Sequence, residues 1–129
     1  LGQNDFCRND EGVVAARLTG YYNITQGSDE ALKRAIAEMG PVSISMNIPE
    51  SLLYYKDGVW SDPECKSGEE DLEHALVATG YGIDEATGLE YFTVKNSWST
   101  NWGDEGYFKV LAGNNMCGIS TGAAVPQVA

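Results

Sequence analysis

Two residues of this sequence have the types and surroundings that acid–base chemistry needs, His74 and Asn96. His74 is the only histidine among 129 residues, and Trp98 follows Asn96 by two positions. A carboxamide oxygen can accept a hydrogen bond from one ring nitrogen of a histidine and so fix its tautomer and angle, while an indole beside that bond excludes water. A histidine held in this way can take the proton of a thiol, which is the activation that a cysteine nucleophile requires.

The elements that bring His74 and Asn96 together have to be two neighbouring strands, because the residues are too far apart along the chain for local geometry to pair them. The sequence predicts strands over His74–Tyr81, Tyr91–Ser97 and Tyr107–Leu111, divided by turns that contain glycine. Val42–Met46 alternates apolar and small polar residues, which is the period of a further strand.

One helix is predicted between Ser28, which is a good N-cap, and Gly40, which Pro41 follows. Its apolar residues recur on one face: Ala31, Leu32, Ala35, Ile36 and Met39. The remaining expectations are an irregular Leu1–Gly12, an extended Val13–Ile24, one helical turn over Ser51–Tyr55 and a short edge strand at Ala123–Val125. The fold class is therefore α+β and mostly β, a curved antiparallel sheet or open barrel with one clear helix.

The three cysteines leave one without a partner inside the chain. None of them has the context of a catalytic thiol. For Cys7 three interpretations remain: a bridge to another chain, a free buried thiol, or a nucleophile. Its polar neighbours argue against burial, and it lacks the helix N-terminus that lowers a thiol pKa. A bridge from Cys7 is favoured if Cys65 and Cys117 pair with each other, as the resemblance described below implies.

Charge and composition narrow the classes of partner. The net charge of −11 and pI of about 4.2 argue against binding nucleic acid or an anionic membrane surface, and no apolar run has the length of a membrane span.

Asn23-Ile24-Thr25 is an N-glycosylation sequon, expected on a surface loop. The acidic run from Glu69 to Glu73 lacks the pattern of a calcium loop. We expect neither a metal nor a cofactor, and a processed product that begins at Leu1.

Several motifs together resemble one protein family. They are, in chain order, Gly40–Ser43, Glu73–Gly82, Lys95–Trp98, Trp102–Tyr107 and Met116–Ile119. These segments resemble the C-terminal half of papain-type cysteine proteases, the papain and cathepsin family. The nucleophile segment of that family lies far N-terminal to the histidine, and nothing here matches it. Residues 1–129 are therefore expected to form a single His- and Asn-bearing half, completed by a separate N-terminal chain.

The resemblance implies a role for individual residues. His74 is the general acid–base, Asn96 orients it and Trp98 shields their bond. The substrate pocket matches Ser45, Leu72, Ala75 and, at its floor, Gly122. Glu73 borders this pocket where the family usually has Asp or Asn, and Ser99 stands where it usually has Gly. Cys65 pairs with Cys117, and Cys7 bonds to the partner chain.

Three functional hypotheses follow. The first is the C-terminal chain of a two-chain cysteine endopeptidase, from a two-subunit branch of the family that Leu1–Cys7 and Asn96–Thr100 resemble. The second is an inactive relative that serves as a binding or scaffold module, and the third is a self-sufficient binding domain. Retention of His74, Asn96 and Trp98 favours the first, and the unpaired Cys7 argues against the third. The expected partners are the nucleophile-bearing chain, peptide substrates and an inhibitory pro-segment. The protein is expected in a lysosome or another acidic vesicle, or to be secreted.

Overall fold

The computed structural model describes residues 12–129. Within this range it contains one α-helix, α1 (Asp29–Met39), and short 3₁₀ turns at η2 (Glu50–Tyr54), η3 (Glu69–Asp71) and η4 (Met116–Gly118). The strands are β1 (Leu18–Asn23), β2 (Val42–Met46), β3 (Val59–Trp60), β4 (His74–Ile83), β5 (Glu90–Lys95), β6 (Tyr107–Leu111) and β7 (Ala124–Val128).

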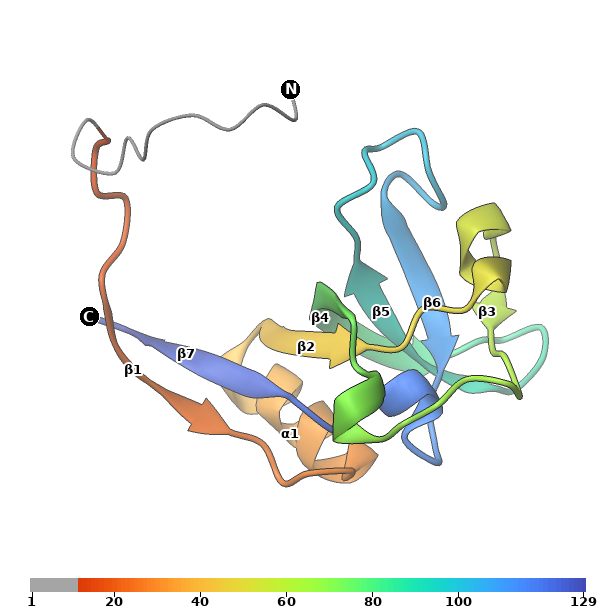
Figure 1. The fold of residues 1–129 in the computed structure, drawn as a ribbon, viewed down its shortest axis with the longest axis horizontal. Helices are drawn as coiled ribbons and strands as arrows, with labels where there is room; N and C mark the ends of the chain where they lie inside the picture. The colour runs from red at the N-terminus through yellow and green to blue at the C-terminus, as the bar shows by residue number, and fades with distance from the viewer. Residues whose placement is uncertain (1–11) are drawn as a thin grey trace.

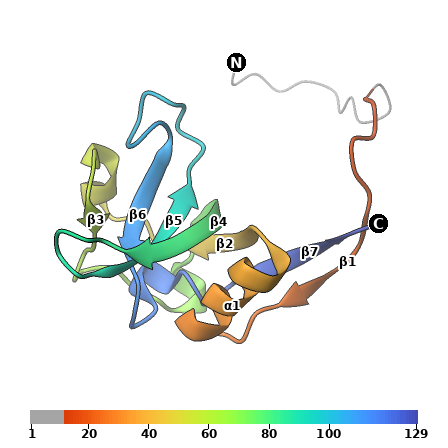
Figure 2. The same ribbon diagram turned by 180° about the vertical axis from the view of Figure 1, so that it is seen from behind.

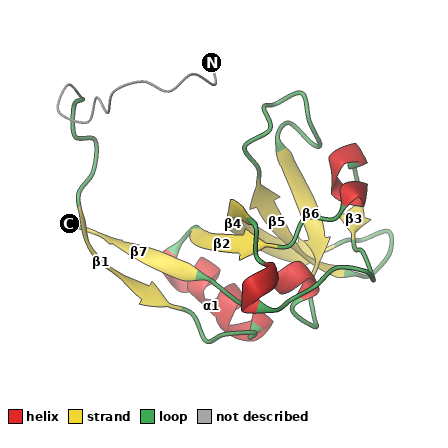
Figure 3. Ribbon diagram, viewed as in Figure 1, coloured by secondary structure: helices red, strands yellow, loops and turns green. Residues whose placement is uncertain are grey.

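The seven strands form one sheet in the order β1-β7-β2-β4-β5-β6-β3. Figures 1 and 3 show the sheet curving without closing on itself. Every pairing is antiparallel except that of β3 with β6, which is parallel. This architecture confirms the predicted fold class, a mostly β α+β domain with an open sheet and one helix.

Helix α1 begins and ends as its sequence predicts. The Ser28 Oγ accepts a hydrogen bond from the Ala31 N–H at 3.1 Å, and Gly40 follows the last turn with a φ of +99°. Leu32 and Ile36 are buried, and the helix packs against β2 and β4. Figure 2 shows α1 beside these strands. Met39 is the exception on the predicted apolar face, because 48% of its surface is exposed.

The core lies where alternate residues of β2, β4, β5 and β6 face inward. Phe92 and Val94 of β5 and Phe108 and Val110 of β6 are at most 1% exposed. Their two-residue period is that of strands with one buried face. Burial of these side chains contributes about 25 cal/mol per Å² of apolar area to the stability of the sheet. β4, β5 and β6 therefore hold the residues at their ends firmly in place.

Several strand bounds differ from the predicted ones. The extended segment predicted over Val13–Ile24 is a strand only from Leu18 to Asn23, where β7 is available to pair with it. β4 continues past Tyr81 to Ile83, because its hairpin with β5 stays paired as far as Glu90. β5 ends at Lys95, so Asn96 lies just outside the strand. β3 was not predicted, since two residues carry no periodicity.

The C-terminal strand is the clearest correction. The prediction of a short edge strand over Ala123–Val125 is wrong: β7 runs from Ala124 to Val128 and lies between β1 and β2. It pairs with β2 only where Ala124 faces Ser43, so most of one side of β7 has no strand beside it. Pro126, which has no N–H to donate, is tolerated in such a position. The edge is instead β1, and the β1–β7 pair projects from the rest of the molecule in both Figures 1 and 2.

Candidate active site

The first residue of β4 and the residue after β5 meet at one end of the sheet. β4 and β5 pair antiparallel with Val77 opposite Lys95, which brings His74 and Asn96 side by side. The His74 Nε2 and the Asn96 Oδ1 are 2.9 Å apart. The predicted strand pairing therefore produces a hydrogen bond between the two residues that the sequence singled out.

The second contact of the Asn96 oxygen decides the tautomer of His74. The Asn96 Oδ1 also accepts a hydrogen bond from the Ser97 N–H at 2.7 Å. An atom that accepts from a backbone N–H is the carbonyl oxygen of the amide, which cannot donate. His74 Nε2 is therefore the donor, and in the neutral ring the proton on Nε2 leaves a lone pair on Nδ1. Such an arrangement suits Nδ1 to take a proton from an incoming acid.

Two tryptophans form an aromatic wall beside this pair. The Trp98 ring stacks on the His74 ring with centroids 5.3 Å apart and an interplanar angle of 29°. The Trp102 ring meets Trp98 edge to face at 5.0 Å, and its Nε1 donates to the Leu53 carbonyl at 3.1 Å. Trp102 is half-buried and packs against the core. The wall therefore lies along one side of the His74–Asn96 pair.

The other end of the Asn96 amide has a different environment. Only 9% of Asn96 is exposed, and its Nδ2 is buried without a hydrogen-bond partner within residues 12–129. A buried N–H donor that lacks an acceptor costs about 1–3 kcal/mol. This amide therefore has an unused donor at the site itself.

Ser99 shows the local strain that its position implies. Its φ is +68°, in the left-handed region where glycine is preferred. Its hydroxyl accepts a hydrogen bond from the Asn101 N–H at 3.3 Å, which offsets part of that strain. The turn carries no group of the His74–Asn96 pair. Serine in place of the family's usual glycine at position 99 therefore leaves the geometry of that pair intact.

The residues matched to the substrate pocket form two contacting pairs. Ser45 of β2 lies directly opposite Ala75 of β4, so both side chains project from the same face of the sheet. Leu72 lies against the backbone of Gly122, where an added Cβ would come 3.1 Å from the Leu72 Cδ1. A shallow hollow of about 360 Å³ is lined by Ala75, Asn96 and their neighbours, while Ser45, Leu72 and Gly122 are outside its lining.

Glu73 makes contacts that the sequence did not predict. Its Oε1 accepts hydrogen bonds from the Ile48 N–H at 3.1 Å and from the Asn47 Nδ2 at 3.3 Å. Asn47 also donates to the Asp71 carbonyl at 3.2 Å and accepts from the Lys66 N–H at 3.1 Å. The Glu73 carboxylate is thus hydrogen-bonded to the turn after β2. Asn47 joins these loops, and no local sequence pattern predicts this role.

Cys65 and Cys117 are joined by a disulfide that closes a separation of 52 residues, with their Cα atoms 5.0 Å apart. The bond ties the loop before η3 to η4, close to Asn47, whose backbone N–H donates to the Cys117 carbonyl at 2.9 Å. Cys7 lies outside the described residues.

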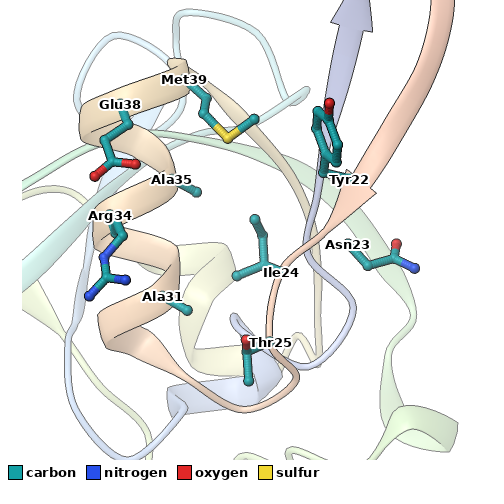
Figure 4. A pocket seen from close by; sticks show the side chains of 9 residues that line it. All are labelled: Tyr22, Asn23, Ile24, Thr25, Ala31, Arg34, Ala35, Glu38 and Met39. Atoms are coloured by element: carbon teal, nitrogen blue, oxygen red, sulfur yellow. The ribbon is translucent and has the colours of Figure 1, made fainter.

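The sequon lies away from the site. Asn23 is the exposed last residue of β1, rather than a loop residue, because the β1–β7 pairing extends to Asn23 opposite Ala124. A hollow of about 420 Å³ lies beside it, between α1 and the chain from Tyr22 to Thr25. Figure 4 shows the side chains that line this hollow. The Ile24 side chain points towards Ala31 and Ala35 of the helix, whereas the Asn23 side chain points away from the helix. The Asn23 amide is therefore open to modification.

Within residues 12–129, no three or more His, Cys, Asp or Glu side chains are grouped as metal ligands. In the same range, no helix has both the length and the apolar character needed to cross a membrane.

Comparison with known proteins agrees with the geometry of the site. The family model described as papain family cysteine protease matches residues 2–127. Cathepsin L of Sarcophaga peregrina is 42% identical over 129 residues, covering 98% of this chain and 37% of that protein. Thiol protease aleurain of Arabidopsis thaliana is 41% identical, covering 99% of this chain and 35% of that protein.

The fold of the chain is also similar to that of solved structures. Digestive procathepsin L 3 of the Tenebrio molitor larval midgut superposes with a TM-score of 0.89 at 34% identity, covering 97% of this chain and 40% of that one. A chain that carries the paired histidine and asparagine on this open sheet, and that matches the family over nearly all its length, belongs to the papain family of cysteine proteases. It spans a little over a third of the length of the curated relatives above and corresponds to the C-terminal part of the fold.

Proposed function

We propose that this chain supplies the general acid–base and its orienting amide to a papain-like cysteine endopeptidase. The single observation that carries the proposal is the hydrogen bond from His74 Nε2 to Asn96 Oδ1, 2.9 Å long and covered by Trp98. This bond leaves the lone pair of the neutral imidazole on Nδ1, the state that a base needs. The nucleophilic cysteine comes from the N-terminal half of the protease.

In the proposed reaction His74 relays a proton twice, first from the thiol to the leaving amine and then from water to the thiolate. The thiol of the partner half transfers its proton to His74 Nδ1, and the resulting thiolate attacks the carbonyl carbon of a peptide bond. As the C–N bond breaks, the imidazolium returns the proton to the leaving amine and an acyl-enzyme remains. His74 then takes a proton from water as the water attacks the acyl carbon, and it protonates the departing thiolate. Asn96 Oδ1 stabilises the imidazolium throughout.

Two observations support a missing partner half. The chain spans 37% or less of the two curated relatives compared above. The buried Nδ2 of Asn96 also has no acceptor within residues 12–129, and an oxygen from the partner half would satisfy it. We propose that this half is a separate chain joined through Cys7, since Cys65 and Cys117 already bond to each other.

The surroundings of the complete protease follow from the same proposal. An inhibitory pro-segment precedes the mature enzyme, and Asn23 carries a glycan, for which its exposed amide is suitably placed. The protease works in a lysosome or another acidic vesicle, or is secreted. An acidic compartment relieves the self-repulsion of a chain with net charge −11, because carboxylates take up protons there.

The pocket of Ser45, Leu72, Ala75 and Gly122 selects a bulky apolar residue one position upstream of the residue whose carbonyl is attacked. Its residues are small or apolar and carry no charge. Glu73, the neighbouring carboxylate, is bonded to Ile48 and Asn47 and so offers little to a basic substrate. In fluorogenic peptides varied at this one position, Leu or Phe should exceed Arg in kcat/KM by roughly tenfold or more.

The decisive test uses the complete protein, with both halves present. His74→Ala should lower kcat by about a thousandfold or more, because the base and the acid are both lost, while thermal unfolding stays close to that of the unchanged protein. Thr79→Val, a substitution in β4 away from the reacting groups, serves as the matched control and should retain activity. If His74→Ala keeps most of the peptidase activity, the proposed role is wrong. If the unchanged protein itself cleaves no peptide, the inactive binding module is the better interpretation.

A further inference from the structure

Thr121 lies between the floor of the proposed pocket and the loop that carries one of its walls. Its hydroxyl donates a hydrogen bond to the Ser67 carbonyl at 2.8 Å and accepts one from the Asn115 Nδ2, also at 2.8 Å. Thr121 is 9% exposed and immediately precedes Gly122. The hydroxyl uses its donor and one acceptor position at once, so it ties the segment before β7 to the loop that leads to Leu72.

The Asn115 side of this link is held firmly. The Asn115 Oδ1 accepts from the Ser120 N–H at 2.8 Å, so both ends of its amide are bonded. The Asp29 Oδ2 accepts from the Gly113 N–H at 2.7 Å and from the Asn115 N–H at 3.3 Å. The Ser120 hydroxyl donates to the second oxygen of Asp29. Through these bonds the first residue of α1 anchors the segment on which Thr121 stands.

The Leu72 side of the link depends on close contact with backbone. An added Cβ on Gly118 would lie 2.6 Å from the Leu72 Cδ2, and one on Gly122 would lie 3.1 Å from the Leu72 Cδ1. Leu72 therefore rests directly on these two glycines. How far it stands from Gly122 depends on where the loop from Cys65 to Leu72 is held. The disulfide holds the start of that loop, and Thr121 holds it at Ser67.

We propose that Thr121 is a specificity-positioning residue, whose hydroxyl sets the spacing between Leu72 and Gly122 and thereby the preference of the pocket for a bulky apolar side chain. This inference rests on the proposed function. Without the hydroxyl, the exposed Ser67 turns its carbonyl to water and the loop loses its middle attachment. Leu72 then moves relative to the floor. A substrate with Leu in the pocket loses contact, whereas one with Ala, which fills little of the pocket, loses hardly any.

The experiment compares substitutions that separate this role from general destabilisation. Thr121→Val removes the hydroxyl with little change of shape, and Thr121→Ser restores it. The matched control is Thr79→Val, because the Thr79 hydroxyl also donates to a backbone carbonyl, that of Thr93, at 3.3 Å. In the complete protease, the ratio of kcat/KM for a Leu peptide to that for an Ala peptide should fall about fivefold in Thr121→Val. The loss of one hydrogen bond is of this size. Thr121→Ser and Thr79→Val should keep the ratio.

A second measurement does not depend on peptidase activity. The Asp71 N–H donates to the Gly68 carbonyl at 3.1 Å and the Leu72 N–H to the Glu69 carbonyl at 3.4 Å. Amide hydrogen exchange at Asp71 and Leu72 should accelerate in Thr121→Val and not in Thr79→Val. If Thr121→Val does not accumulate as folded protein, Thr121→Ala replaces it in both measurements.

The outcomes distinguish the positioning role of Thr121 from the proposed peptidase function. Unchanged exchange at Asp71 and Leu72 would overturn the positioning role whether or not the protein is a peptidase. Accelerated exchange with an equal fall in kcat/KM for the Leu and Ala peptides would also overturn it, since the loop would then be structural only. Accelerated exchange in a protein that cleaves no peptide would leave the positioning of Leu72 supported and would count against the proposed function.

Discussion

At the scale of single residues, the orientation of one amide is what makes His74 suitable as a base. The Asn96 oxygen accepts from both the Ser97 N–H and His74 Nε2, so the amide cannot turn over without losing both bonds. Trp98 also stacks on the His74 ring. The interaction strengthens when His74 becomes an imidazolium, because a hydrogen bond to a charged donor is about twice as strong as a neutral one. In the proposed reaction, Asn96 would therefore stabilise the charged form of His74 more than the neutral form.

Asn96→Ala should lower kcat without abolishing turnover. A hydrogen bond to a charged group contributes about 1.5–3 kcal/mol, which corresponds to about a ten- to hundredfold loss of kcat in the complete protease. His74 remains present, so the loss is smaller than that of His74→Ala. Steady-state kinetics of Asn96→Ala beside Asn101→Ala, an exposed amide in the next turn, measure it. A value of kcat equal to that of the control would show that Asn96 does not orient His74.

At the scale of elements, the site depends on how 3₁₀ turns and loops are fastened to the sheet. Tyr55, which follows η2, is 7% exposed. Its hydroxyl donates to the Gly58 carbonyl at 2.8 Å and accepts from the Lys109 N–H of β6 at 3.2 Å. The ring also packs against Trp102, with centroids 5.8 Å apart. Tyr55 thus fastens the segment beside the aromatic wall to β6.

The titration of Tyr55 predicts how stability depends on alkaline pH. Burial, with a smaller contribution from the charges of Asp104 and Asp57, raises the pKa of Tyr55 above its ordinary value of 10.0. A group whose pKa is higher in the folded state stabilises it fully below the unfolded pKa, and this stabilisation is lost as pH rises through the folded pKa. The free energy of unfolding should therefore fall above about pH 10, and less steeply in Tyr55→Phe. Urea unfolding at pH 8 to 11 measures both slopes, and equal slopes would contradict the assignment.

At the scale of the whole molecule, the described residues expose apolar side chains on the β4–β5 hairpin. Val77, Tyr81, Ile83 and Leu89 are 37%, 46%, 62% and 42% exposed. Val77 also lines the hollow next to Asn96. Of these side chains, Val77 is the one at the end of the hairpin near Asn96, and an exposed apolar side chain beside an unsatisfied buried donor is typical of a surface that a partner covers. This agrees with the proposed N-terminal half.

The isolated chain should behave as an incomplete protein. Expressed alone, residues 1–129 should bind a hydrophobic dye or aggregate, because the area around Val77 stays open to solvent. The complete protease should release a second polypeptide on a reducing gel, and Cys7→Ser should release it without reductant. A monodisperse monomer that unfolds cooperatively and carries a free Cys7 thiol would contradict the proposed two-chain assembly.

The sequence by itself determined the features that depend on neighbouring residues. Ser28 and Gly40 delimit α1, because capping and left-handed backbone act within one turn of helix. The two-residue period of Val42–Met46 identifies β2. Several separate motifs, among them those around His74 and Asn96, together predicted the family to which the chain belongs.

Only the tertiary structure decided the features that depend on contacts between distant segments. Glu73 accepts hydrogen bonds from Asn47 and Ile48, and no sequence pattern links this loop to Glu73. Thr121 reaches Ser67, 54 positions away, and β7 inserts between β1 and β2 rather than lying at the edge. Such pairings are selected by burial and by the satisfaction of polar groups over the whole core. A residue's neighbours in sequence carry no signal of them, whereas caps and strand periods are local by nature.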